Sequence, residues 1–154
     1  MPLLDLANIA CGFHAGDAAT MVRTVQLAKK HHKLVGAHPG LPDKEGFGRR
    51  LMDIPAETLY AQVLYQVGAL KAVLDAEGMR LNHIKPHGKL YRMIKDDEAV
   101  GRACMRAIST FGVPFVGLPG TRHEALCEEF GVEFVPEFFP DLWYDDEGQT
   151  VPIL

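Results

Sequence analysis

Residues 17–40, DAATMVRTVQLAKKHHKLVGAHPG, contain the unit that decides the fold. The stretch begins with Asp17, a residue type that caps helices, and its apolar residues then recur at the spacing of a half-buried helix. Residues 33–37 follow as a short apolar run, which predicts a buried strand, and the polar His38 comes directly after it. A helix that leads within a few residues into a strand is half of a β-α-β unit.

The same alternation runs along the whole chain and predicts an α/β fold. Helices are expected over residues 17–32, 55–78, 96–112 and 121–131, and strands over 6–10, 33–37, 81–85, 113–117 and 132–135. Serial β-α-β construction calls for a parallel sheet. Five strands can form an open doubly wound sheet or part of a barrel, but they cannot close a barrel as eight do. Both ends resemble cuts through a larger fold, so we expect one partial domain over residues 1–154.

Composition excludes several classes of protein. Hydrophobic residues make up 47% and charged residues 23%, which is ordinary for a globular chain and excludes a disordered one. The formal charge of −4 offers no basic excess for nucleic acid or an anionic membrane. No apolar run approaches the ~18 residues of a membrane span. Three cysteines without a CxxC pair indicate a reducing compartment, so we expect a cytoplasmic protein.

Polar residues follow the predicted strands at their carboxyl ends, the edge where parallel α/β folds bind ligands. His14 comes after the first strand, His38 after the second, and His83, Lys85 and His87 at the end of the third. The last three share one face if that strand stays extended. Such groups suit an anionic or carbonyl-bearing substrate, because they supply acid–base catalysis and stabilise developing negative charge.

Each candidate also has a plainer interpretation, and the sequence leaves these alternatives open. The histidines could be structural and Lys85 a surface residue, and Cys11 is either a nucleophile or a packed side chain. The loop over residues 46–50, with Arg49 and Arg50, either clamps an anion or covers the site. Elsewhere, we expect the side chains of His31, His32 and His123 to be solvated. We expect those of Cys104 and Cys127 to be packed in the core.

A metal site is a further candidate, while several catalytic motifs are absent. The sequence has no phosphate-binding GxxxxGK[ST] loop, GxGxxG, HExxH or GxSxG. A zinc ion could be held by histidines, although a catalytic site usually adds a carboxylate or a water. Asp17 is the acidic residue nearest to them in sequence. The candidate ligands are His14, His38, His83 and His87.

Four motifs together resemble the LamB/YcsF family of lactam-utilisation proteins, whose bacterial members are the A subunit of 5-oxoprolinase. They are ANIACGFHAGD at 7–17, GAHPG at 36–40, GFGRR at 46–50 and HIKPHGKLY at 83–91. The resemblance implies an incomplete TIM-like (β/α) barrel of the glycoside hydrolase/deacetylase type. It also implies ATP-dependent opening of 5-oxo-L-proline to L-glutamate with partner subunits B and C.

On this resemblance we expect ATP as the cofactor of the complex and a small lactam as the substrate. The histidines keep a divalent metal as a further candidate cofactor. The expected catalytic residues are His14, His38, Lys85 and His87. The expected substrate-binding residues are Asn8, Cys11, Asp17, Arg49, Arg50 and Tyr91.

The chain also departs from the family pattern. Family members begin with a strand bearing Asp-x-Asn-x-Asp-x-Gly-Glu, which this sequence lacks, and two family arginines are replaced by Leu142 and Ile153. Two other hypotheses therefore stay open. One is a metal-dependent deacetylase or amidohydrolase that acts alone, and the other is an inactive truncated remnant.

Overall fold

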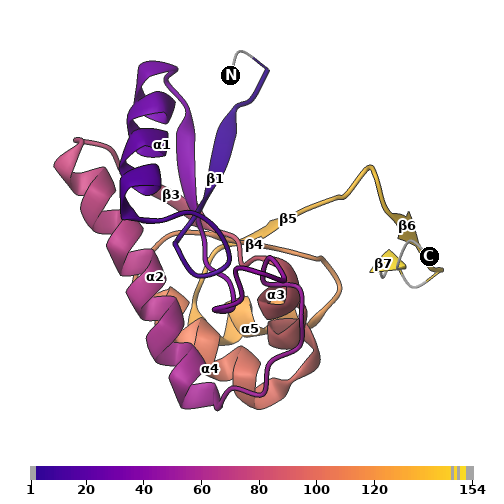
Figure 1. Cartoon of the computed structure of the whole chain (residues 1–154). Coiled ribbons are helices and arrows are strands. Elements are labelled where there is room, and N and C mark those ends of the chain that lie inside the picture. Colours follow the sequence, from indigo (N-terminus) through magenta and orange to yellow (C-terminus); the bar gives the residue numbers. More distant parts are fainter. Residues whose placement is uncertain (1–2, 147, 149, 152–154) are drawn as a thin grey trace.

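The chain forms one open, parallel five-stranded sheet (Figure 1). A computed structural model describes residues 3–146, 148 and 150–151. The strands of the sheet are β1 (Leu6–Ala10), β2 (Leu34–His38), β3 (Leu81–Ile84), β4 (Phe115–Gly117) and β5 (Phe134–Pro136). All four neighbouring pairs are parallel, and the order in the sheet is β1-β2-β3-β4-β5. The predicted α/β class with five parallel strands is confirmed.

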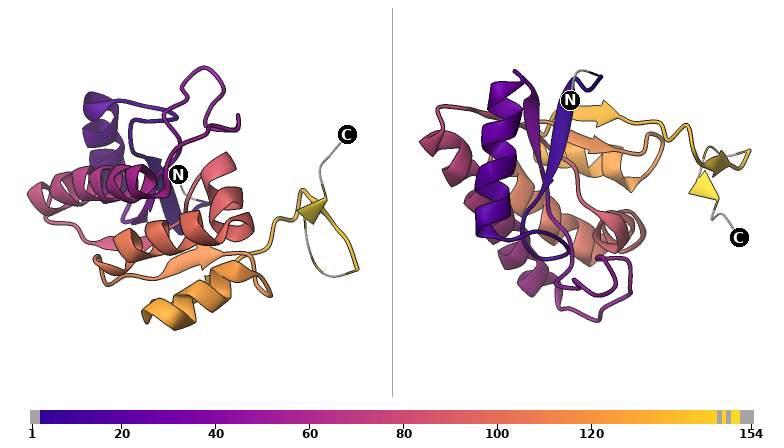
Figure 2. Two further views of the ribbon diagram at one scale, coloured as in Figure 1. Left: turned by 90° about the horizontal axis from the view of Figure 1, so that it is seen from below. Right: turned by 45° about the horizontal axis from the view of Figure 1, so that its top comes forward.

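The strand order decides between the two architectures that the sequence left open. A doubly wound sheet reverses its strand order part-way, whereas here the order in space equals the order in sequence. Sequential addition of strands is the construction of a β/α barrel, of which this sheet is an open arc. Helices α2 and α4 pack against each other, as do α1 with α2 and α4 with α5 (Figure 2). The helices are α1 (Ala18–Lys30), α2 (Ala56–Ala76), α3 (Gly88–Asp96), α4 (Glu98–Ser109) and α5 (Arg122–Phe130).

Local sequence signals fix where several of these helices begin and end. The Asp17 carboxylate accepts a hydrogen bond of 2.7 Å from the Thr20 N–H, and the Thr121 hydroxyl accepts one from the His123 N–H. Glu124, in the first turn of α5, accepts a hydrogen bond from the N–H of Gly120. At the other end of α5, Gly131 adopts the left-handed conformation that favours glycine.

The region between β3 and β4 differs from the prediction of a single helix. It contains two helices, α3 and α4, which meet at Asp97. Asp97 ends α3 and caps α4 through a hydrogen bond from the Val100 N–H. We missed α3 because it begins at Gly88 without a side-chain cap and is only nine residues long. The helix count is therefore five among the described residues.

Two further predictions about strands are corrected by the structure. Strand β3 ends at Ile84, so Lys85 and His87 lie beyond it and do not share an extended face with His83. Beyond β5, a two-stranded antiparallel hairpin that we did not predict projects away from the sheet (Figures 1 and 2). Its strands are β6 (Trp143–Tyr144) and β7 (Thr150–Val151). Ile153, expected at a family arginine position, lies outside the described residues.

The core fills the space between the sheet and the helices. The apolar stripe of α2 is fully buried at Val63, Val67, Leu70 and Leu74, against side chains of the sheet and of α4. Cys104 and Cys127 are buried, as the sequence predicted. Among the described residues, no helix combines the length and apolar character needed to cross a membrane.

Two helical glycines allow a test of this packing. An added Cβ at Gly101 of α4 would lie 2.6 Å from the Ile94 carbonyl oxygen and 2.8 Å from Leu126 Cδ1, whereas one at Gly68 of α2 would meet nothing within 4 Å. We expect Gly101→Ala to lower the free energy of unfolding by about 1–3 kcal/mol through overpacking. The control Gly68→Ala should raise it by roughly 0.5–1 kcal/mol, because alanine is the better helix former. Urea unfolding of both variants measures the difference, and equal effects would contradict the packing described.

Candidate functional site

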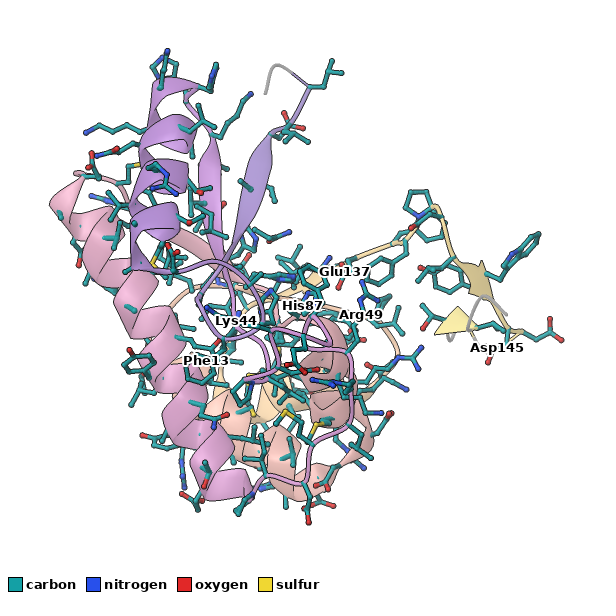
Figure 3. All side chains as sticks on the ribbon, viewed as in Figure 1. Phe13, Lys44, Arg49, His87, Glu137 and Asp145 are labelled. Carbon is teal, nitrogen blue, oxygen red and sulfur yellow. The ribbon has the colours of Figure 1, made fainter. Side chains whose placement is uncertain are left out.

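A cleft of about 640 Å³ opens at the carboxyl ends of the strands. Its lining combines the ends of β2 and β3, helix α3 and the segment after β5, so residues far apart in sequence meet there. Figure 3 labels two of the lining residues, Arg49 and His87. The polar or charged lining residues are His38, Arg49, Lys85, His87, Lys89, Tyr91, Arg92, Asp141 and Thr150. Four of them are lysines or arginines and one is an aspartate, so the cleft suits an anion.

A shielded ion pair spans the sheet at this cleft. The Lys85 ammonium contacts the Glu137 carboxylate, with side chains 19% and 10% exposed. Lys85 follows β3 and Glu137 follows β5, so the pair reaches across β4. The Lys85 Nζ also lies 4.8 Å from the centre of the Phe139 ring. These contacts hold the ammonium in one place at the cleft wall.

Glu137 is the functional candidate that we missed in the sequence. It directly follows a strand, which is the signal that identified the histidines and Lys85, but we predicted β5 over 132–135 rather than Phe134–Pro136. Burial raises the pKa of the nearby Tyr91 hydroxyl, and the charge of Glu137 raises it further. Tyr91 lines the same cleft from α3 and is thus a neutral phenol there.

Three histidines gather beside the ion pair. His14 comes from the loop after β1, His38 ends β2, and His87 precedes α3. The rings of His14 and His87 stack with centroids 3.9 Å apart and planes 5° from parallel, and the ring of His38 meets both edge-on. Each histidine offers a ring nitrogen within 4.8 Å of the other two. The structure therefore brings together three of the four predicted metal ligands.

Backbone carbonyl groups fix the orientation of two of these rings. His38 Nδ1 lies 2.5 Å from the Lys85 carbonyl oxygen, and His87 Nε2 lies 2.6 Å from that of Phe47. A carbonyl oxygen only accepts, so each of these nitrogens carries the proton. The other two nitrogens, His38 Nε2 and His87 Nδ1, lie 3.0 Å apart.

Burial keeps the cluster uncharged near neutral pH. Desolvation is the main cause that lowers the pKa of His38 to about 3 and that of His14 to about 4, and the neighbouring imidazoles act in the same direction. The pKa of His87 is also lowered, first by burial and then by the charge of Arg49. Neutral imidazoles present lone pairs, so these side chains are suited to accept a proton or to bind a metal.

Glycines create the space that the buried rings occupy. A Cβ on Gly40 would lie 2.4 Å from His14 Nδ1, and one on Gly48 would lie 2.8 Å from the His14 Cβ and 3.0 Å from His87 Cδ2. Gly48 also has a φ of 65°, in the left-handed region. The glycines in the GAHPG and GFGRR motifs are thus required by the histidines that they face.

His83, the fourth predicted metal ligand, belongs to a different contact. Its Nε2 lies 2.6 Å from the Asn8 Oδ1, and its ring fills the space above Gly36. Because the amide oxygen accepts, the Nε2 of His83 carries the proton and points to β1. The structure therefore places Asn8 and His83 together, apart from the three clustered histidines.

The remaining predicted site residues are spread over the surrounding loops. Asp17 is exposed at the start of α1, and Arg50 pairs with Asp43, while Arg49 lines the cleft together with Tyr91. Cys11 is only 4% exposed, and burial raises the pKa of its thiol to about 12, which favours the packed interpretation over the nucleophile.

The prediction for His123 was wrong. His31 and His32 are exposed, as expected, but His123 is fully buried between the rings of Phe115 and Tyr91. Its Nδ1 accepts from the Leu118 N–H at 3.2 Å and its Nε2 donates to the Tyr91 carbonyl at 2.9 Å, so the neutral ring is fully hydrogen-bonded. Its ring lies against Gly117, another glycine that makes room for an imidazole.

The sequence and the fold of this chain both match known proteins. The family model described as the LamB/YcsF family matches residues 1–153. The chain belongs to the LamB/YcsF family. It is 54% identical over 151 residues to the lactam utilization protein of Emericella nidulans, covering 98% of this chain and 59% of that relative. It is 48% identical over 153 residues to the 5-oxoprolinase A subunit of Thermus thermophilus, covering 98% of this chain and 61% of that relative.

Comparison of structures agrees with this membership. The crystal structure of the lactam utilization protein from Thermus thermophilus matches with a TM-score of 0.95 at 48% identity, covering 99% of this LamB/YcsF chain and 62% of that one. The chain thus spans about three-fifths of the length of the curated relatives that it matches.

The buried His123 predicts acid sensitivity of the folded state. Burial lowers its pKa from 6.5 to about 4. Between these values the unfolded chain binds a proton that the folded chain excludes, so stability falls as the pH drops below about 6.5. We expect the lowered pKa of His123 to reduce the free energy of unfolding by about 2 kcal/mol when the pH falls from 7 to 5.

Urea unfolding at both pH values should therefore show a smaller acid loss in His123→Gln than in the wild type. The other buried histidines act in the same direction, so the variant keeps some acid sensitivity. Leu126→Ala, a destabilised control that retains His123, should keep the wild-type pH dependence. An unchanged pH dependence in His123→Gln would contradict the assignment.

Proposed function

We propose that this chain performs the role of the A subunit of a 5-oxoprolinase: the ATP-dependent hydrolytic opening of 5-oxo-L-proline, or a related lactam, to L-glutamate. It would do so in the cytoplasm with partner subunits B and C. The names of its relatives support this function, and the observation that carries it is the Lys85–Glu137 ion pair beside three neutral histidines in a cationic cleft.

The lining of the cleft fits the charge of the proposed substrates. The carboxylate of 5-oxo-L-proline and the phosphates of ATP are anions, and Arg49, Lys85, Lys89 and Arg92 surround the space. Arginine binds a carboxylate or a phosphate through two parallel hydrogen bonds, whereas lysine acts as a point charge. Arg49 and Arg92 are exposed and free to adjust to a ligand, while Lys85 is held by Glu137.

The lactam itself requires activation, because an amide carbonyl is a poor electrophile. In the proposed sequence, the amide oxygen attacks the γ-phosphoryl group of ATP and ADP leaves. Water then attacks the carbonyl carbon of the phosphorylated lactam, and the C–N bond breaks to leave the γ-phosphate ester of glutamate, an acyl phosphate. A second water hydrolyses this acyl phosphate to glutamate and phosphate. Lys85 would stabilise the negative charge on the oxygen or on the transferred phosphoryl group.

The three histidines would orient the substrate and transfer protons in this scheme. Their neutral rings can accept the proton that the attacking water loses and return it to the leaving nitrogen. Asn8 supports the site indirectly, because it holds His83 against the neighbouring strand. Asp17 would act through its capping of α1, which anchors one end of the loop that carries His14.

A second candidate function is a metal-dependent amidohydrolase or deacetylase that acts without ATP. The observation that favours it is the convergence of ring nitrogens from His14, His38 and His87. This alternative predicts that hydrolysis proceeds without ATP and stops when a chelator is added.

Substitutions at the cleft test the proposed function. In the complete protein with its partner subunits, we expect Lys85→Ala and His87→Ala each to lower ATP-dependent glutamate formation by about 100-fold or more. Lys71→Ala, which removes an exposed lysine of α2 paired with Asp75, should retain the wild-type rate. Coupled assays of glutamate and ADP measure both products. Wild-type rates in both cleft variants would refute the roles proposed here.

A further inference from the structure

We propose that His14, His38 and His87 form a binding site for one divalent transition-metal ion of the Zn²⁺ type. The three side chains come from three separate loops or strand ends, and each offers one ring nitrogen within 4.8 Å of the others. The inference rests on hydrogen bonding at this cluster and does not depend on the reaction proposed above.

The central observation is that two nitrogen lone pairs face each other. The carbonyl oxygens of Lys85 and Phe47 require protons on His38 Nδ1 and His87 Nε2. In neutral rings the remaining nitrogens, His38 Nε2 and His87 Nδ1, are therefore both acceptors, although they lie only 3.0 Å apart. Two acceptors at this distance repel unless a cation lies between or beside them. A metal ion or an additional proton can supply that charge.

The third histidine favours the metal over the proton. One shared proton would satisfy His38 and His87, but it would leave His14 without a role. His14 is 2% exposed, its ring stacks on that of His87, and its Nδ1 has no hydrogen-bond partner in the described part of the chain. An ion bound by all three rings would give a His14 ring nitrogen a partner as well.

The spacing fits a small tetrahedral ion. Zinc binds imidazole nitrogens at about 2.0–2.1 Å, which places two nitrogens of a tetrahedral site about 3.3 Å from each other. This value lies between two distances in the cluster. His38 Nε2 and His87 Nδ1 are 3.0 Å apart, and one nitrogen of each of the three histidines lies within 4.8 Å of the others. An imidazole binds a metal in the plane of its ring, and the rings of His14 and His87 are stacked in parallel, so the His14 ring must turn out of this stack to ligate the ion.

The donor set indicates which ion binds. Imidazole nitrogens suit Zn²⁺, Co²⁺, Ni²⁺ or Cu²⁺, whereas Mg²⁺ and Ca²⁺ require oxygen ligands. The carbonyl oxygens of Lys85 and Phe47 hold the rings of His38 and His87 by hydrogen bonds. In known zinc sites, the ring nitrogen that does not bind the metal commonly makes such a hydrogen bond. His38 and His87 also line the cleft, so a fourth position would face the space in which a substrate is expected.

Metal titration of the chain tests this inference without ATP or lactam, so its outcome is independent of the proposed function. The protein is first treated with EDTA and dialysed, and it is then titrated with Co²⁺ and, separately, with Zn²⁺. We expect one equivalent to bind, with the visible absorption of four-coordinate Co²⁺ and a rise in melting temperature. Failure of the wild-type chain to bind either ion stoichiometrically would overturn the proposal.

Matched variants assign the ligands. His14→Ala should weaken Co²⁺ binding by at least about 10-fold. His83→Ala, which removes an equally buried histidine outside the cluster, should retain wild-type affinity. Equal effects of both substitutions would overturn the assignment.

Ring-nitrogen NMR of the wild-type protein supplies the same answer if a variant fails to fold. Zn²⁺ should shift the ring signals of His14, His38 and His87 and leave those of His83 and His123 unchanged. Shifts confined to the exposed His31 and His32 would show surface binding and overturn the proposal.

Discussion

The burial of imidazole rings at the carboxyl edge of the sheet is the constraint on which the rest of the site depends. A neutral imidazole carries one donor and one acceptor, and leaving either without a partner in a buried place is unfavourable. The fold gives the ring donors partners through backbone carbonyl groups at His38, His87 and His123, and through a side-chain amide oxygen at His83. The loops that carry these groups are consequently held in one arrangement.

The same constraint explains the glycines. Each buried ring lies where a side chain on the neighbouring segment would otherwise stand, as at Gly36, Gly40, Gly48 and Gly117. Protein interiors have little free volume, so a ring can be accommodated only if its neighbour has no Cβ. The glycine-rich loops are therefore part of the site, even though glycine itself contributes no functional group.

The ion pair of Lys85 and Glu137 adds a second link across the strand ends. Removing a lysine and a glutamate from water is unfavourable unless they pair, so neither side chain is stable there without the other. The pair ties the end of β3 to the end of β5, and it places a fixed positive charge beside the neutral histidines. A fixed cation, neutral imidazoles and exposed arginines thus lie close together at one cleft, an arrangement that suits an anionic ligand.

The sequence by itself determined the repeating pattern of the fold and five of the residues that line the cleft, which are His38, Arg49, Lys85, His87 and Tyr91. Apolar spacing, helix caps and polar residues after strands are local signals, so they predicted five parallel strands, four of the five helices, and the positions of His14, His38, Lys85 and His87. It did not reveal α3, which lacks a cap, or Glu137, because the end of β5 was misplaced. Only the tertiary structure decided that the strands follow sequential order, that His83 pairs with Asn8, and that His123 is buried. These features depend on contacts between segments far apart in sequence, and a local pattern does not specify which segments meet.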